Sequence, residues 1–247
     1  MPNPTTHMEM AYLAAQQVDA KVLNENMGYY LLGSTAPDVR VITRRGREPY
    51  HFAPLDFDEV GAGITSLFRE HPQLVEIKHG PTRSFMAGYM THLTLDETWI
   101  TRMYRPLFGV DGVFDTEAEG AVMDRVMQME LDTLALQRLD VLKTHLSSFD
   151  GGGVEIPFID GDTLSEWHEW VTSFISHEFT WDRLRFMAMR ISRGDESHPA
   201  HAIADDFVRG MPDTLDVLHE TVPTERLVEF KRDAIADIAR VVAEHLA

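Results

Sequence analysis

Apolar residues recur at spacings of three and four along nearly the whole chain, which is the period of amphipathic helices. Thr6 and Glu9 fit a capping box and predict the start of the first helix, which continues through MAYLAAQQV. Further helices are predicted over residues 20–32, 57–70, 82–104 and 116–145, and four more are predicted to begin near residues 163, 181, 199 and 212–223. The pattern therefore predicts an all-α fold of about eight to nine helices.

Two segments interrupt the helical pattern. Residues 34–56 contain three prolines and a glycine, and residues 146–162 include GGGVEIPF, which is compatible with a short strand or with none. Neither segment is long and polar enough to be a disordered linker between domains. We therefore expect residues 1–247 to form a single domain, and a second domain that starts near residue 155 is the less favoured alternative.

Composition places the chain among ordinary globular proteins. Of its 247 residues, 44% are hydrophobic and 25% are charged, and there is no cysteine, which excludes disulfides, thiolate zinc sites and thiol nucleophiles. The first residues, MPNPTTHMEM, have neither the basic nor the apolar region of a signal peptide. No apolar run reaches the roughly 18–20 residues of a spanning helix. These features predict a cytoplasmic protein.

The charge balance limits the kinds of partner. The formal net charge is −18, and so acidic a chain is expected to bind neither nucleic acid nor anionic membranes, which are held by Lys and Arg. One stretch, RVITRRGR, carries Arg40, Arg44, Arg45 and Arg47. It is compatible with a local site for a small anion and with a solvated loop, of which the loop is the commoner case.

One predicted helix contains an unexpected polar pair. The stretch GYMTHLTLDETW carries His92 and Asp96 four residues apart, which places both side chains on one helix face. Such a pair alone is a weak signal, since a buried ion pair or a cap explains it as well. Here Asp38 in LLGSTAPD, His51 in YHF and His7 also lie in the first hundred residues. Together they supply the nitrogen and oxygen donors that zinc prefers.

These motifs resemble a known family. TTH near the N-terminus, LLGSTAPD, HF and GYMTHLTLDETW, in that order, look like the zinc-dependent phospholipase C family, whose wider superfamily includes the single-strand-specific nucleases. The resemblance covers about residues 1–105, under half of the chain. It implies an all-α fold with a metal cleft between the N-terminal helices.

The resemblance also implies a set of ligands. Asp38, His51 and His92 would hold one zinc ion, which Asp96 would also reach. His7 would hold a second zinc ion, and Asp96 would bridge the two. Asp38 would orient or deprotonate the attacking water. In secreted members the N-terminal amine chelates the second ion, and whether Met1 or Pro2 supplies an amine here is left open.

The chain departs from the family at a third zinc site. Arg102 stands where secreted members have a histidine, and the next predicted helix, TEAEGAVMDRVMQMELD, contains no histidine. We expect the third site to be lost and Arg102 to place a fixed positive charge there, which would suit an anionic oxygen. Arg44 or Arg45 could assist in binding phosphate oxygens.

A later group, His198, His201 and Asp205, is compatible with a further metal site. The surrounding stretch SHPAHAIADDF is polar all round, so an exposed surface position is the favoured interpretation.

The residues together predict a metal-dependent hydrolase that acts on a phosphoester through a metal-activated water, with two zinc ions or other divalent transition metals. A small soluble phosphoester is at least as plausible a substrate as a phospholipid head group. The alternative is a helical metal-binding protein without catalytic activity. An iron or manganese redox enzyme would carry paired E-x-x-H motifs on two helices, and none of the predicted helices contains one.

Overall fold

Helices form wherever the apolar period is strong. The computed structural model describes residues 1–247 and contains no β-strand. The helices of seven or more residues are α1 (Pro4–Val18), α3 (Met27–Gly33), α6 (Ala62–Glu70), α7 (Gly80–Trp99), α8 (Glu117–Ala135), α9 (Leu139–Leu146), α10 (Gly161–Ser176), α11 (Arg183–Ile191), α12 (Ala200–Arg209), α13 (Asp213–Thr221) and α14 (Thr224–Leu246). Shorter α-helices are α2 (Lys21–Glu25), α4 (Arg40–Thr43) and α5 (Glu48–His51). The all-α prediction is confirmed, and the expected number of helices was too low.

The structure has more helices than expected because breaks that apolar periodicity does not show divide several of the expected helices. The helix expected over residues 20–32 is interrupted at Asn26, and the one expected over 116–145 is interrupted by a 3-10 turn at Leu136–Arg138. Near the C-terminus Pro223 separates α13 from α14. Because an apolar face continues across such a break, the spacing of apolar residues predicts one helix where the structure has two. The segment GGGVEIPF forms no strand.

The capping box predicted for the first helix is wrong. α1 begins at Pro4 with Asn3 as its N-cap, and proline suits the first helical position because its missing N–H would have no partner there. The Thr6 hydroxyl instead donates to Asp132 Oδ1 of α8, at 2.7 Å. Glu9 is fully buried and faces other helices. Both residues therefore serve tertiary contacts.

Glu9 joins three parts of the chain. Its carboxylate lies 2.7 Å from Nζ of Lys231 in α14 and 2.9 Å from a guanidinium nitrogen of Arg138, which ends the turn between α8 and α9. A buried carboxylate needs such partners, because an unpaired one would carry a large desolvation penalty. The C-terminal helix is thereby attached to the first helix of the chain.

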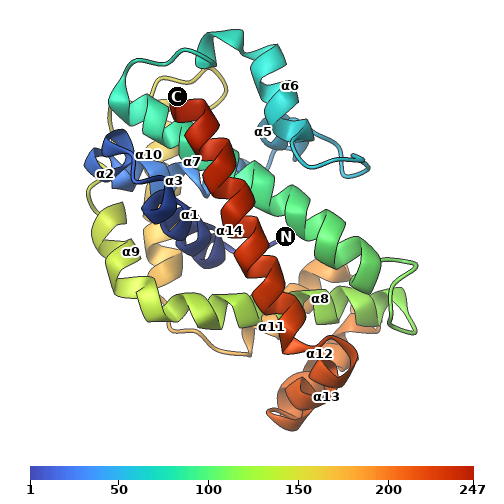
Figure 1. Ribbon diagram of the computed structural model, residues 1–247. Coiled ribbons are helices and arrows are strands. Elements are labelled where there is room, and N and C mark those ends of the chain that lie inside the picture. The colour runs from blue at the N-terminus through green and yellow to red at the C-terminus, as the bar shows by residue number, and fades with distance from the viewer.

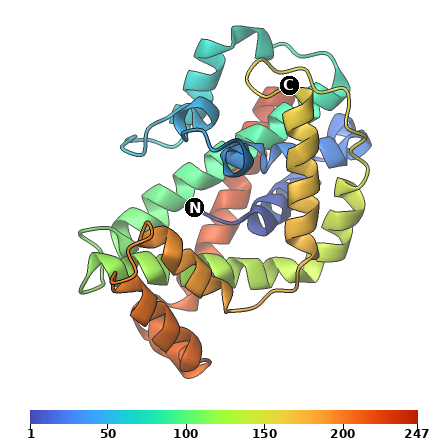
Figure 2. The same cartoon turned by 180° about the vertical axis from the view of Figure 1, so that it is seen from behind.

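The helices pack in layers around α1. In Figure 1 α14 runs across the front of α1 and α7, and Figure 2 shows α10 on the opposite side, where it contacts α1 and α9. One cluster of 53 buried apolar residues extends from Met8 to Val242. We propose that residues 1–247 form a single domain, and this continuous core supports it. No helix combines the length and apolar character needed to cross a membrane.

Two glycines set the closest helix crossing. A Cβ atom at Gly88 of α7 would lie 2.0 Å from the carbonyl oxygen of Tyr30, and one at Gly33 of α3 would lie 2.1 Å from that of Phe85. The backbones of α3 and α7 are thus in direct contact, and no side chain larger than hydrogen fits between them. This contact brings the segment that follows α3 against the middle of α7, where His92 lies.

Candidate metal centre

The five predicted ligands come from four separate elements. α7 carries His92 and Asp96, α1 carries His7, α5 ends at His51, and the 3-10 helix η1 (Ala36–Val39) carries Asp38. All five side chains converge in the interior, where the three imidazoles and Asp96 are about 1% exposed. Their donor atoms form two overlapping groups in which every atom lies within 4.8 Å of the others: His7, His92 and Asp96, and Asp38, His51 and His92.

Asp96 lies between the three imidazoles. Its Oδ2 atom is 3.2 Å from Nε2 of His51 and 3.5 Å from Nε2 of His92, and its Oδ1 atom is 3.4 Å from Nε2 of His7. The ring of His7 stacks on that of His92 with a centroid distance of 3.9 Å. The two carboxylate oxygens therefore serve different imidazoles, as a bridging carboxylate would.

The separations between donor atoms fit a shared cation. Around a tetrahedral zinc ion with ligands at about 2.0–2.1 Å, neighbouring ligand atoms lie about 3.3 Å apart. The Nε2 atoms of His51 and His92 are 3.3 Å apart, and the distances from these nitrogens to Asp96 are similar. Most N–H···O hydrogen bonds are shorter, near 2.9 Å. The donor set thus matches a metal site better than a network of direct hydrogen bonds.

The backbone fixes the orientation of His92. Its Nδ1 atom lies 2.9 Å from the carbonyl oxygen of Ser34, just after α3. A carbonyl oxygen only accepts, so Nδ1 carries the hydrogen, and in the neutral ring Nε2 presents its lone pair toward Asp96. Metal-binding histidines are commonly held by such a hydrogen bond. The close crossing of α3 and α7 is what places Ser34 there.

Asp38 lies on the more accessible side of the centre. Its side chain is 18% exposed, and Oδ1 is 3.9 Å from Nε2 of His51 and 3.5 Å from Nε of Arg40. Its Oδ1 atom has no hydrogen-bond partner. Asp38 is therefore the predicted ligand best placed to meet a molecule that enters from solvent.

Unsatisfied polar atoms concentrate at this centre. In the whole protein, eleven buried side-chain nitrogen and oxygen atoms lack a hydrogen-bond partner, and seven of them belong to these residues or to the arginines beside them. Both ring nitrogens of His7 are among them, as are Oδ1 of Asp96 and Nδ1 of His51. Buried polar groups are normally satisfied, so this concentration indicates that a group such as a cation belongs there.

The pKa shifts of His7, His51 and Asp96 favour the binding of a cation at the centre. Burial lowers the pKa of His7 to about 4, with the neighbouring His92 acting in the same direction, and burial also lowers the pKa of His51. Burial opposes the charge on His92 as well, but the Asp96 carboxylate outweighs it and raises the pKa. Burial would raise the pKa of Asp96, yet the imidazoles hold it well below its usual range. At neutral pH His7 and His51 are neutral and Asp96 is ionised, which are the forms that bind metals, whereas the raised pKa of His92 means that a bound cation would displace its proton.

Arg102 does not reach the centre. Its guanidinium donates to Asp237 Oδ2 of α14 at 2.7 Å, and the side chain is 44% exposed. Six helical positions carry residue 102 roughly 240° around the axis from Asp96. The helix also widens there into a π-helical segment, Ile100–Phe108. The structure thus assigns Arg102 an ion pair with the C-terminal helix.

Other arginines approach the cluster instead. A guanidinium nitrogen of Arg47 lies 3.4 Å from Asp96 Oδ2, and the Arg47 side chain is only 14% exposed. Arg40 lies beside Asp38. The side chains of Arg44 and Arg45 are exposed. The sequence singled out the basic stretch, but only the fold shows which of its members face inward.

The N-terminus also lies beside the centre. The Met1 sulfur is 3.6 Å from a guanidinium nitrogen of Arg47, and Pro2 is buried. Burial, followed by the charge of Arg125, lowers the pKa of the Met1 α-amino group to about 6. Near neutral pH this amine is therefore mainly in the unprotonated form that can bind a cation.

The later histidine group does not form a second cluster. Asp205 is paired with Nε of Arg185 at 2.6 Å, the His201 ring bonds the carbonyl oxygen of Asp195, and His198 Nδ1 accepts from the Ala200 amide. Neither group of potential metal ligands includes any of the three. The surface interpretation of this stretch agrees with these contacts.

Comparisons with known proteins identify no relative: no family model, no curated protein and no solved structure matches the chain. The case for metal binding therefore rests on the buried histidines and aspartates of the chain itself.

Proposed function

We propose that the protein is a metal-dependent hydrolase that acts on phosphoesters with two divalent ions, zinc being favoured by the donor set. The observation that carries the proposal is the position of Asp96, whose two oxygens lie 3.2–3.5 Å from three imidazole nitrogens. The resemblance of the motifs to zinc-dependent phospholipases C points to the same chemistry.

The donors divide between the two ions. Asp38, His51 and His92 would hold one ion, which Asp96 Oδ2 beside His51 would also reach, and Asp96 Oδ1 with His7 would hold the other. His92 cannot serve both ions, because its Nδ1 is committed to the backbone and only Nε2 is free. A carboxylate offers two oxygens, so Asp96 is the bridging group.

A pair of divalent ions supplies a water of lowered pKa and neutralises the oxygens of a phosphoester. The protein supplies the remaining functions. Asp38 would orient the attacking water or accept its proton, since its side chain is partly exposed and its buried Oδ1 atom has no hydrogen-bond partner. Arg47 and Arg40 would bind non-bridging phosphate oxygens through their planar guanidinium groups, the role that the sequence assigned to Arg102.

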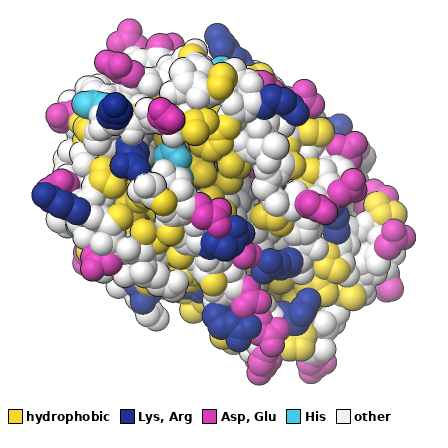
Figure 3. Space-filling model, turned by 45° about the horizontal axis from the view of Figure 1, so that its top comes forward, with side chains coloured by type: hydrophobic (Ala, Val, Ile, Leu, Met, Phe, Trp, Pro, Cys, Tyr) yellow, Lys and Arg dark blue, Asp and Glu magenta, His cyan; other side chains and the backbone are white.

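We favour a small soluble phosphomonoester or phosphodiester over a phospholipid. The net charge of −18 opposes contact with an anionic bilayer. In Figure 3 acidic side chains are spread over the face shown, with basic ones between them and no continuous basic patch. The same charge argues against nucleic acid as a substrate.

A structural metal site without catalysis is the second candidate. The three histidines and Asp96 are almost completely buried, which a site that only stabilises the fold would share. The two candidates differ in coordination, because a structural zinc ion is held by four protein ligands and a catalytic one keeps a position for water. Activity decides between them.

The test combines metal analysis with a screen for phosphoesterase activity. We expect purified protein to carry divalent metal, and His92→Ala and Asp96→Asn to lose most of it together with all cleavage of phosphomonoester and phosphodiester substrates. His201→Ala, which changes a histidine away from the centre, is the matched control and should keep both properties. Circular dichroism verifies that each variant is folded.

Two results would change the conclusion. Equal metal content in all preparations would show that the site is wrongly assigned. Loss of metal from the two site variants, with no phosphoester cleaved by the loaded wild-type protein, would reject the hydrolase and support the structural site.

A further inference from the structure

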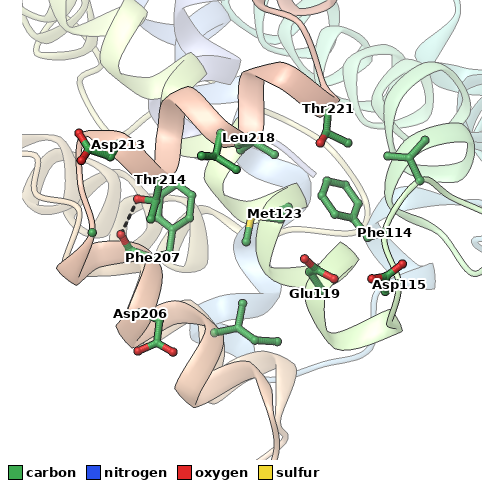
Figure 4. A pocket seen from close by; sticks show the side chains of 14 residues that line it. Phe114, Asp115, Glu119, Met123, Asp206, Phe207, Asp213, Thr214, Leu218 and Thr221 are labelled. Atoms are coloured by element: carbon green, nitrogen blue, oxygen red, sulfur yellow. Dashed lines mark hydrogen bonds between the residues drawn. The ribbon is translucent and has the colours of Figure 1, made fainter.

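A second hollow lies away from the metal centre. It has a volume of about 680 Å³ and is enclosed by the segment before α8, the N-terminal half of α8, and the pair α12 and α13 (Figure 4). None of the five predicted metal ligands lines it. Its volume falls within the range of roughly 300–1,000 Å³ that is usual for small-molecule pockets.

The floor of this pocket is apolar. Figure 4 shows Phe114, Met123 and Leu218 around one space, and Phe207 completes the lining from α12. Leu218 and Phe207 are only 4% exposed and belong to the hydrophobic core. The apolar part of a ligand would therefore pack against side chains of the hydrophobic core.

The rim of the pocket carries acidic residues and no basic ones. Asp115, Glu119, Asp206 and Asp213 line it, and no Lys or Arg does. Asp206 forms an ion pair with Arg209 at 2.8 Å, while the other three carboxylates have no ion-pair partner. Carboxylates of like charge that line one concave surface add to a common negative potential, which attracts a cation.

We propose that this pocket binds a small organic monocation, an amine attached to an apolar group. The apolar part would occupy the space between α8 and α12, and the ammonium would lie among the rim carboxylates. This binding function is separate from the proposed hydrolysis.

The lining disfavours other ligands. An anion would meet four carboxylates, of which only Asp206 is paired with a cation, Arg209. A bare metal ion needs donor atoms close together, and the only groups in the protein whose donors lie that close are at the metal centre. Charge complementarity and the size of the pocket therefore favour a small cationic molecule.

The test compares three molecules of similar shape by calorimetric titration of the full-length protein: 4-phenylbutylamine, 4-phenylbutanol and 4-phenylbutyrate. We expect the amine to bind saturably at one site, at least tenfold more tightly than the alcohol, and the carboxylate not to bind. Glu119→Gln combined with Asp213→Asn should weaken binding of the amine at least tenfold and leave binding of the alcohol unchanged. Val217→Trp, at a pocket position that is 61% exposed, should weaken both by filling the space.

The control variant is Glu166→Gln with Glu169→Gln, which removes two exposed carboxylates from α10 and gives the same change in net charge. If this control weakens the amine as much as the pocket variant does, the attraction is a general effect of the −18 charge and the proposal fails. It also fails if the amine and the alcohol bind equally or if the amine shows no saturable binding. Dimerisation that Val217→Trp abolishes would assign the pocket to a second copy of the chain and overturn the small-ligand proposal.

Discussion

A hydrogen bond to the backbone determines which nitrogen of His92 faces the metal centre. The Ser34 carbonyl oxygen holds Nδ1, so Nε2 points to Asp96 and His51. The spacing of His92 and Asp96 predicted that both lie on one face of a helix, and the structure places their nearest donor atoms 3.5 Å apart. The residue that orients the ring could not be predicted, because any residue can supply a carbonyl oxygen.

Removal of His7 tests the division of donors between two ions. His7 contacts only the Oδ1 side of Asp96, so His7→Ala should reduce the stoichiometry from two ions to one, while Asp96→Ala should remove both. Elemental analysis after gel filtration measures the ratio of metal to protein. Loss of both ions from His7→Ala, in a variant that circular dichroism shows to be folded, would contradict the assignment of separate ions.

At the scale of helices, α7 positions the centre through its contacts with two neighbours. On one side Gly33 and Gly88 allow α3 to touch it. On another side the Glu97 carboxylate accepts hydrogen bonds from the amides of Gly61 and Gly63, which attaches the start of α6 to α7. The role of Glu97 therefore depends on a helix start more than thirty residues away in the chain.

A methyl group at the crossing of α3 and α7 tests this arrangement. Within an exposed helix Gly→Ala would be stabilising by about 1 kcal/mol. In Gly88→Ala the added carbon would meet the Tyr30 carbonyl at 2.0 Å, so we expect a loss of about 3 kcal/mol in the free energy of unfolding and weaker metal binding. Urea denaturation measures the first and metal titration the second.

Gly46→Ala is the control for this substitution, because nothing lies within 4 Å of a Cβ atom there. It should change the free energy of unfolding by less than about 0.5 kcal/mol. A Gly88→Ala protein as stable as this control would show that the two helices do not touch.

Across the whole molecule, the C-terminal helix covers the elements that carry the centre. α14 contacts both α1 and α7, as Figure 1 shows, and Lys231 anchors it to the buried Glu9. Near its end His245 stacks on Phe68 of α6, with ring centroids 5.9 Å apart. The Nε2 atom of His245 is buried without a hydrogen-bond partner. This contact makes the packing of the C-terminal helix sensitive to pH.

Acid should destabilise the fold through His245. Burial, with a contribution from Arg83, lowers its pKa from 6.5 to about 4. Below about pH 6.5 the unfolded chain binds a proton that the folded chain does not, so the free energy of unfolding falls as the pH drops toward 4. His245→Phe keeps the ring but cannot titrate, and it should lose about 2 kcal/mol less than wild type between pH 7 and pH 4.

Urea denaturation at the two pH values measures this difference. His177→Phe, at an exposed position, is the matched control and should follow the wild-type pH dependence. If His245→Phe follows wild type as well, His245 is protonated in the folded protein and the C-terminal helix packs less tightly than the structure shows.

The sequence by itself determined the class of fold and singled out the histidines and aspartates that the structure brings together. The spacing of apolar residues predicts helices, and the i, i+4 spacing of His92 and Asp96 predicts that both lie on one helix face. Both predictions need only residues that are close together in the sequence. The breaks between helices were missed because apolar periodicity continues across them. Arg102 was expected at the centre, but its side chain points elsewhere. The direction of this side chain depends on its position around the helix axis, and the helix widens into a π-helical segment beyond Trp99, which apolar periodicity does not show.

Only the tertiary structure decided which groups lie together in space. Three features join segments that are distant in the chain. They are the approach of Arg47 to Asp96, the hydrogen bond that His92 Nδ1 donates to the Ser34 carbonyl oxygen, and the pocket between α8, α12 and α13. Such contacts follow from the packing of helices around one core. No local pattern records which side chains that packing brings within a few ångströms.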